Sequence, residues 1–122
     1  MSYFFRGRVI KGQGYGKKIG FPTANIDRKE YLKKKLNIPF GVYAGLVSLG
    51  DRVYKAGIVI GPKDEKGQPK LEAHLIGHNS DIYGKHLVFR LEKFLHKFRK
   101  YQSETELKKQ IAKDIKIIKR LL

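Results

Sequence analysis

The residues of this chain best suited to chemistry lie in a short stretch near its beginning, residues 12–25. The stretch is rich in glycine and carries two adjacent lysines. Glycine lets backbone N–H groups approach a ligand closely, so successive amides can surround phosphate oxygens, and the lysines add positive charge. The residues predicted to contact a nucleotide here are Gly12, Gly14, Gly16, Lys17, Lys18 and Gly20.

A hydroxyl and an amide follow the glycines, directly after Pro22. Thr23 and Asn25 are separated by one residue, so on an extended segment their side chains point the same way. Their oxygens are hard ligands, suited to a Mg²⁺ ion that keeps most of its waters and phosphates. We therefore predict that Thr23 and Asn25 ligate magnesium and contact the nucleotide.

The glycine spacing alone is not specific. In a Gly-x-x-x-x-Gly-Lys-Ser/Thr loop a hydroxyl residue would follow Lys17, but Lys18 stands there. A Gly-x-Gly-x-x-Gly loop fails as well, because Lys17 occupies its third glycine position counted from Gly12. Judged by the glycines alone, a basic hairpin without a ligand is the better interpretation.

A carboxylate and an imidazole form the second candidate pair. Glu72 and His74 lie in a predicted strand, and residues two apart on a strand share a face. Such a pair suits a metal, an acid–base reaction or simply a polar wall of a barrel. Taken alone, the wall is the more common outcome.

Several short apolar segments bounded by turn residues must position these groups. Strands are expected at residues 3–10, 42–49, 52–60, 70–76 and 86–95. Gly50-Asp51 predicts a tight hairpin between the second and third of them, and residues 61–69 read as a polar loop. Residues 29–35 are too short and too charged for a helix, and we interpret them as a basic excursion. This pattern favours a closed antiparallel barrel.

The hydrophobic period changes after Tyr101. Ser103 and Glu106 form a capping box at the start of a predicted helix. One face of that helix is apolar and the other is rich in lysine, so we expect it to pack on the barrel. Its apolar residues are Leu107, Ile111, Ile115, Ile118 and Leu122.

Length and composition limit the class of protein. With 122 residues, 41% of them hydrophobic, the chain is expected to be one globular domain, residues 1–122. It has no apolar run of the ~20 residues that a membrane span requires. It has no cysteine, which excludes disulfides, thiolate metal sites and cysteine nucleophiles. We expect a cytoplasmic protein that does not associate with membranes.

The net charge of +16 attracts polyanions such as nucleic acids and nucleotide phosphates. A basic barrel that binds RNA or DNA is therefore an alternative function. Lysine-rich surfaces more often serve solubility, however, and the lysines here lack the interleaved aromatic residues of a stacking platform. We expect nucleic-acid binding to be weak and non-specific.

Motifs in the same order along most of the chain resemble the riboflavin kinase family. The segment Gly20-Phe21-Pro22-Thr23-Ala24-Asn25 is similar to the signature that follows the family's glycine-rich flap. Further similar segments are Gly-Val-Tyr-Ala at 41–44, the strand at 54–61, Glu-Ala-His-Leu-Ile at 72–76, Asp-Ile-Tyr-Gly at 81–84, and the run from Phe94 to Asp114.

This resemblance implies a Greek-key antiparallel β-barrel of about six strands with a C-terminal helix. It implies transfer of the γ-phosphoryl group of ATP to the 5′-hydroxyl of riboflavin, giving FMN and ADP, with Mg²⁺ as the cofactor. Glu72 matches the family's general base, and with His74 on the same face of its strand it is expected to point into the mouth of the barrel. We expect a monomer, either a stand-alone kinase or the kinase domain of a bifunctional FAD synthetase.

The chain also departs from the family pattern, mainly toward the flavin side. The loop containing Lys63 lacks a usual arginine and threonine, and Gly77-His78 replaces a common Asp-Phe pair. His96 stands where an arginine is frequent, and Phe98 where a glutamate is frequent. These departures leave a non-catalytic flavin sensor as a further alternative.

Overall fold

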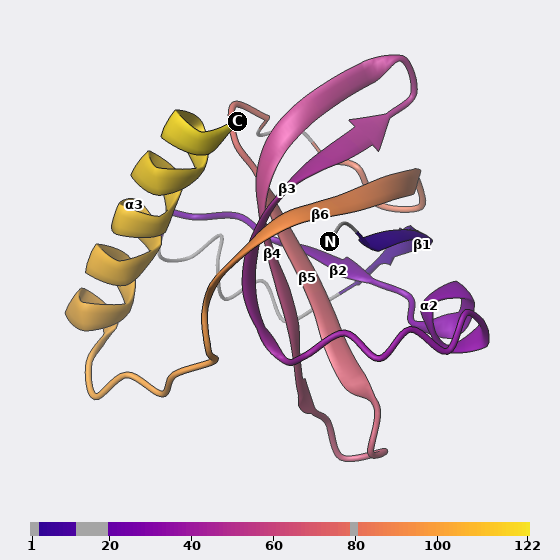
Figure 1. Cartoon of the computed structure of the whole chain (residues 1–122), viewed down its shortest axis with the longest axis horizontal. Coiled ribbons are helices and arrows are strands. Elements are labelled where there is room, and N and C mark those ends of the chain that lie inside the picture. The colour runs from indigo at the N-terminus through magenta and orange to yellow at the C-terminus, as the bar shows by residue number, and fades with distance from the viewer. Residues whose placement is uncertain (1–2, 12–19, 79–80) are drawn as a thin grey trace.

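A computed structural model describes residues 3–11, 20–78 and 81–122 of the chain. The described residues form six strands and two helices (Figure 1). In chain order these are β1 (Tyr3–Ile10), β2 (Ala24–Ile26), α2 (Lys29–Lys33), β3 (Gly41–Leu49), β4 (Arg52–Lys63), β5 (Pro69–Leu75), β6 (His86–His96) and α3 (Glu104–Leu121).

The strands close into an antiparallel barrel in the order β1-β2-β5-β4-β3-β6. Strands β3, β4 and β5 follow one another as hairpins, and β6 returns to pair beside β3. The spatial order 6-3-4-5 is that of a Greek key. The predicted fold, a six-stranded Greek-key barrel with a C-terminal helix, is confirmed.

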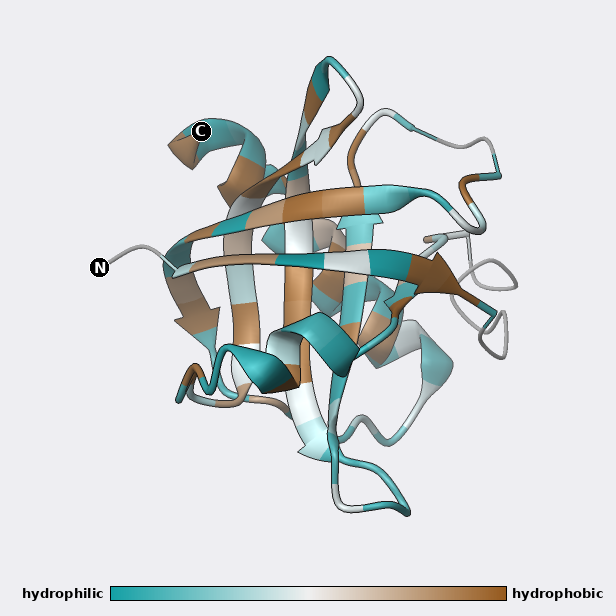
Figure 2. Cartoon of the chain, turned by 90° about the vertical axis from the view of Figure 1, so that its right-hand side faces the viewer, coloured by the Kyte–Doolittle hydropathy of each residue, from teal (hydrophilic) through white to brown (hydrophobic). Residues whose placement is uncertain are grey.

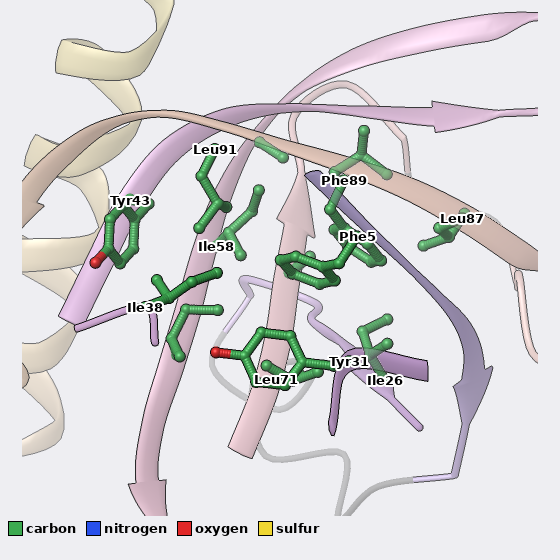
Figure 3. Close-up of a cluster of buried hydrophobic side chains, with 14 of the residues drawn as sticks. Phe5, Ile26, Tyr31, Ile38, Tyr43, Ile58, Leu71, Leu87, Phe89 and Leu91 are labelled. Carbon is green, nitrogen blue, oxygen red and sulfur yellow. The ribbon is translucent and has the colours of Figure 1, made fainter. Parts of the chain in front are cut away.

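Apolar side chains from alternate strand positions fill the barrel (Figure 3). Phe5 of β1 and Phe89 of β6 stack with ring centroids 4.8 Å apart. Ile58 of β4 and Leu71 of β5 meet them from the other side of the barrel and are 1% and 3% exposed. Because the interior is occupied by this core, polar side chains at the intervening positions face outward.

Most predicted strands are observed with small shifts at their ends. The hairpin at Gly50 is confirmed, and nine residue pairs join β3 to β4. The predicted polar loop at 61–69 is partly wrong, since β4 continues to Lys63 and β5 begins at Pro69. The remaining connection is hydrophilic (Figure 2). The short strand β2 is not among the predicted strands, although the metal-site prediction places Thr23 and Asn25 on an extended segment.

The interpretation of residues 29–35 as a basic excursion is wrong, because Lys29–Lys33 form the helix α2. The helix buries Tyr31, which meets Phe5 edge-on with ring centroids 5.0 Å apart. Its lysines and glutamate face solvent, and the high charge of the segment hides the fact that one aromatic side chain belongs to the core. Tertiary packing therefore overrides the weak local propensity of this segment.

Helix α3 begins as predicted. The Ser103 hydroxyl accepts a hydrogen bond from the Glu106 amide at 3.2 Å, and the Glu106 carboxylate accepts one from the Gln102 amide at 3.4 Å. The helix lies along one side of the barrel, opposite α2 (Figure 1). Ile118 is fully buried, and a Cβ on Gly57 of β4 would lie 3.3 Å from its Cδ1 atom. The absence of a side chain at Gly57 thus lets α3 approach the barrel.

Neither of the two helices in the described part of the chain is long and apolar enough to cross a membrane.

We predict that Tyr31→Ala lowers the free energy of unfolding by about 3 kcal/mol or more, as expected for removing a buried aromatic ring. The matched control is Leu32→Ala. Leu32 is its neighbour in α2 but is 40% exposed, and we expect a loss of about 0.5 kcal/mol or less there. Denaturant unfolding of both variants tests this, and equal losses would contradict the role of Tyr31 in anchoring α2.

Candidate active site

Strand pairing aligns five residues in one row across the barrel wall. Asn25 of β2 pairs with Glu72 of β5, and Glu72 pairs with Val59 of β4. Val59 pairs with Val42 of β3, which in turn pairs with His96 of β6. Directly opposed residues on antiparallel strands project to the same side of the sheet, about 5 Å from one another. The row is therefore polar at its ends and apolar in its middle.

This row lies on the outside of the barrel. On β5, Leu71 and Ala73 point into the core and are 3% and 1% exposed, so Glu72 between them points outward. The expectation that Glu72 points into the mouth of the barrel is wrong. The reason is that Phe5, Phe89 and their neighbours already fill the interior.

A cleft of about 650 Å³ runs along the row, between the barrel wall and α3. Thr23, Asn25 and Glu72 line its polar end. Its apolar part lies between two walls, one from the strands and one from the helix. The main apolar residues are Val42, Val59, Leu107, Ile111 and Ile115, with Phe98 and Tyr101 from the segment before α3. The cleft suits a ligand with a flat apolar part and a polar arm that reaches Glu72.

His74 ties the turn before β2 to the polar end of the cleft. Its Nδ1 atom lies 2.7 Å from the carbonyl oxygen of Pro22, so Nδ1 carries the proton and donates. The Phe21 ring meets the His74 ring edge-on at 6.2 Å. The shared face predicted for Glu72 and His74 is confirmed. On that face His74 links β5 to Pro22, the residue directly before Thr23.

The donors at this end fit a magnesium ion bound together with phosphates. Thr23 and Asn25 offer neutral oxygens at the edge of the cleft. Among the described residues, no group of three or more His, Cys, Asp or Glu side chains is placed to hold a metal. An ion here would take most of its ligands from phosphates and water, which is the coordination that Mg²⁺ favours.

Burial raises the pKa of Glu72 above its ordinary value, and the positive charge of Lys70 opposes this rise in part. The carboxylate has been moved out of water without a compensating partner of equal strength, so its ionised form is destabilised. A carboxylate in this state accepts a proton more readily than one in water. This is the property required of a general base.

The described residues cover only part of the predicted nucleotide site. Gly20 is described and adopts φ +89°, a conformation that favours glycine. The other predicted contacts lie outside the described residues, and these are Gly12, Gly14, Gly16, Lys17 and Lys18.

Two polar pairs that line the cleft were missed by sequence reasoning. Arg28 forms an ion pair with Asp64, with 2.6 Å between the guanidinium and the carboxylate. His96 lies 2.9 Å from Asp114 of α3. Each pair joins segments far apart in the chain, so no local pattern could reveal it. The only sequence signal was that His96 departs from the family pattern.

The other departures from the family pattern lie in three places. Phe98 lies at the rim of the cleft, beside His96. Gly77 and His78 line a separate hollow with Tyr54 and Asp81, away from Glu72. Lys63 ends β4, and its neighbour Asp64 reaches the cleft instead.

We predict that Glu72→Gln stabilises the fold at neutral pH. Because the pKa of Glu72 is raised in the folded state, the native protein binds a proton more tightly than the unfolded chain. Stability conferred by the protonated form is therefore lost as pH rises through the range above 4.5. Gln cannot ionise and avoids this loss.

The measurement is the thermal midpoint of the wild type and of Glu72→Gln, at neutral pH and at about pH 4, where a carboxyl group is largely protonated. The advantage of the variant should shrink at the lower pH. Glu65→Gln, at an exposed loop position, is the control and should show no such difference. A wild type that is more stable at neutral pH would instead indicate a stabilising ion pair to Glu72.

Comparison with known families and proteins identifies the family to which the chain belongs. The family described as Flavokinase: Riboflavin kinase matches residues 1–122. A bifunctional riboflavin kinase/FMN adenylyltransferase of Escherichia coli K12 is 34% identical over 120 residues, covering 88% of this chain and 34% of the relative. The chain thus spans about a third of the length of this curated relative.

Two solved structures share the fold. A Streptococcus pneumoniae protein described as a macrolide-efflux protein superposes with a TM-score of 0.82 at 27% identity, covering 95% of this chain and 38% of its own. Riboflavin kinase from Trypanosoma brucei superposes with a TM-score of 0.76 at 21% identity, covering 99% of this chain and 77% of its own.

Proposed function

Because this chain belongs to the riboflavin kinase family, we propose that it transfers the γ-phosphoryl group of ATP to the 5′-hydroxyl of riboflavin, giving FMN and ADP. The observation that carries the proposal is the row on the outer barrel wall. It places a half-buried carboxylate with a raised pKa between a hard-oxygen pair and an apolar cleft.

The two ends of the cleft match the two parts of riboflavin. The flat isoalloxazine ring fits the apolar part, between Val42 and Val59 on the barrel and Ile111 on α3. The ribityl chain then extends along the wall toward Glu72. This arrangement brings the terminal hydroxyl to the carboxylate at the border between the apolar and polar ends.

Phosphoryl transfer needs mainly positioning and neutralisation of charge. The 5′-oxygen forms a bond to the γ-phosphorus, the bond from this phosphorus to the β–γ bridging oxygen breaks, and ADP leaves. Glu72 orients the hydroxyl and receives its proton. Mg²⁺, held by Thr23 and Asn25, would neutralise phosphate charge. His74 keeps Thr23 in place through Pro22, and the glycines and lysines at 12–20 would surround the phosphates.

The proposal includes a monomer that acts in the cytoplasm. Within a longer protein the chain would serve as the kinase part, as in the bifunctional relative. Nucleic-acid binding is not favoured as the main function, because the lysines of α3 have no aromatic residues between them in the sequence. A cleft with a candidate general base also favours an enzyme over a sensor.

We predict that Glu72→Gln lowers kcat by about 10²–10⁴-fold, the usual contribution of a general base. Gln preserves size and hydrogen bonding, so the KM values for riboflavin and ATP should change little. FMN formation followed by chromatography under single-turnover conditions gives the rate. Glu65→Gln should retain full activity. A fully active Glu72→Gln protein would remove the role as general base.

We predict that Thr23→Ala and Asn25→Ala each raise the Mg²⁺ concentration needed for half-maximal rate, by about tenfold or more, because each removes one hard oxygen ligand. The controls are Thr105→Ala and Asn37→Ala, which change the same residue types at exposed positions. Magnesium titration at saturating substrates measures the effect. Unchanged magnesium dependence in both site variants would exclude the proposed ligands.

A further inference from the structure

His96 ends β6 and joins the barrel to α3. Its side chain is 12% exposed, as is that of Asp114. The Nε2 atom of His96 lies 2.9 Å from the Oδ2 atom of Asp114, in the middle of the helix. The Nδ1 atom lies 2.9 Å from the carbonyl oxygen of Lys97.

Both partners of the imidazole are acceptors. A neutral imidazole has one N–H group and can donate to only one of them, whereas the imidazolium donates to both. Both contacts can therefore be hydrogen bonds at the same time only when the imidazole is charged. The Oδ1 atom of Asp114 accepts a further hydrogen bond at 2.9 Å from the Gln110 side chain, one turn earlier in α3. Both carboxylate oxygens are thus engaged, one by the barrel and one by the helix.

The pair stands beside the apolar part of the cleft. His96 is the β6 member of the outer row and pairs with Val42. Nearer its end α3 also contacts the barrel, and two of these contacts are relevant here. These are Ile118 over Gly57 and the hydrogen bond, 3.2 Å long, from the Lys55 side chain to the Lys119 carbonyl. The His96–Asp114 bond therefore fixes the part of the helix that carries Gln110 and Ile111 over Val42.

We propose that His96 is a positioning residue: its bond to Asp114 sets the spacing between α3 and the barrel wall, so that riboflavin binding weakens as pH rises and the imidazole loses its charge. This inference rests on the proposed function, because it takes the cleft to be the riboflavin site. Histidine is the side chain whose charge normally changes between pH 5 and 8. An arginine at this position, frequent in the family, would keep its charge throughout that range.

Few other charged groups face this pair. Arg99, in the segment before α3, donates to Gln110 at 3.5 Å and carries a constant charge. Burial raises the pKa of Tyr101, and the Asp114 charge adds to the rise, so its phenol stays neutral at these pH values. From β3 and β4 the facing residues are Val42, Gly57 and Val59, which do not titrate.

Glu72 lies three strands from His96 along the row, and Lys97 is exposed to solvent. With about 4.8 Å between neighbouring strands, Glu72 is roughly 14 Å away, beyond the screening length of about 8 Å at physiological salt. The ionisation of Glu72 therefore acts separately on catalysis, and the two effects can be measured apart.

The test measures riboflavin affinity by fluorescence, together with kcat and KM, between pH 6 and 8.5. For the wild type we expect the Kd and KM of riboflavin to rise roughly two- to tenfold across this range, which corresponds to the loss of one hydrogen bond. The KM of Mg-ATP and the pH dependence of kcat should show no matching change. His96→Arg should keep tight, pH-independent binding. His96→Gln should bind weakly at every pH.

His86→Gln changes an exposed histidine of the same strand and should retain the wild-type pH profile. In the Glu72→Gln background the rise in riboflavin Kd should persist. A flat riboflavin Kd in the folded wild type, or tight binding by a folded His96→Gln protein, would overturn the inference. Rescue by arginine separates positioning from general destabilisation, which thermal midpoints record in parallel.

The outcomes also separate this inference from the proposed activity. If FMN forms but riboflavin affinity does not depend on pH, the positioning role is wrong and the kinase activity stands. If riboflavin binds with the expected pH profile but no FMN forms, the activity is wrong and the positioning role stands. If riboflavin does not bind to the folded wild type, both are wrong.

Discussion

The densely packed interior of the barrel is the constraint on which the rest of the structure depends. Stacked Phe5 and Phe89 and the aliphatic side chains around them fill the interior. The cleft described above therefore lies on the outside of the barrel. On that side the antiparallel register decides which residues meet, and it brings Glu72 between Asn25 and Val59. The site is thus a consequence of strand pairing across segments that are distant in the sequence.

The outer wall needs a second surface to become a cleft, and α3 provides it. Ile118 packs where β4 has a glycine, so the helix lies close to the barrel at that point. The cleft lies alongside, with a polar end at Glu72 and an apolar part under the helix. In the proposed function this division lets one site hold a flat ring and a charged phosphate group without burying the phosphate against apolar atoms.

Glu72 and Asp114 are two ionisable groups that line the cleft in different surroundings. Burial destabilises the charged form of Glu72, and this is useful for a base. Both oxygens of Asp114 have partners, His96 on the barrel and Gln110 on the helix. In the proposed function the first group takes part in the chemistry, and in the further inference the second holds the helix. Their separation along the wall keeps the two roles electrostatically distinct.

The sequence by itself determined most of the strands, the N-cap of α3 at Ser103, and the shared face of Glu72 with His74. These features depend on local periodicity, turn residues and capping, which act within a few residues of the chain. The tertiary structure alone decided that Glu72 faces outward, that the burial of Tyr31 stabilises a helix in a charged segment, and that His96 forms a hydrogen bond with Asp114. The physical reason is that an alternating pattern identifies two faces of a strand but not which one is covered. That choice is made by packing and register between segments that the chain brings together only when it folds.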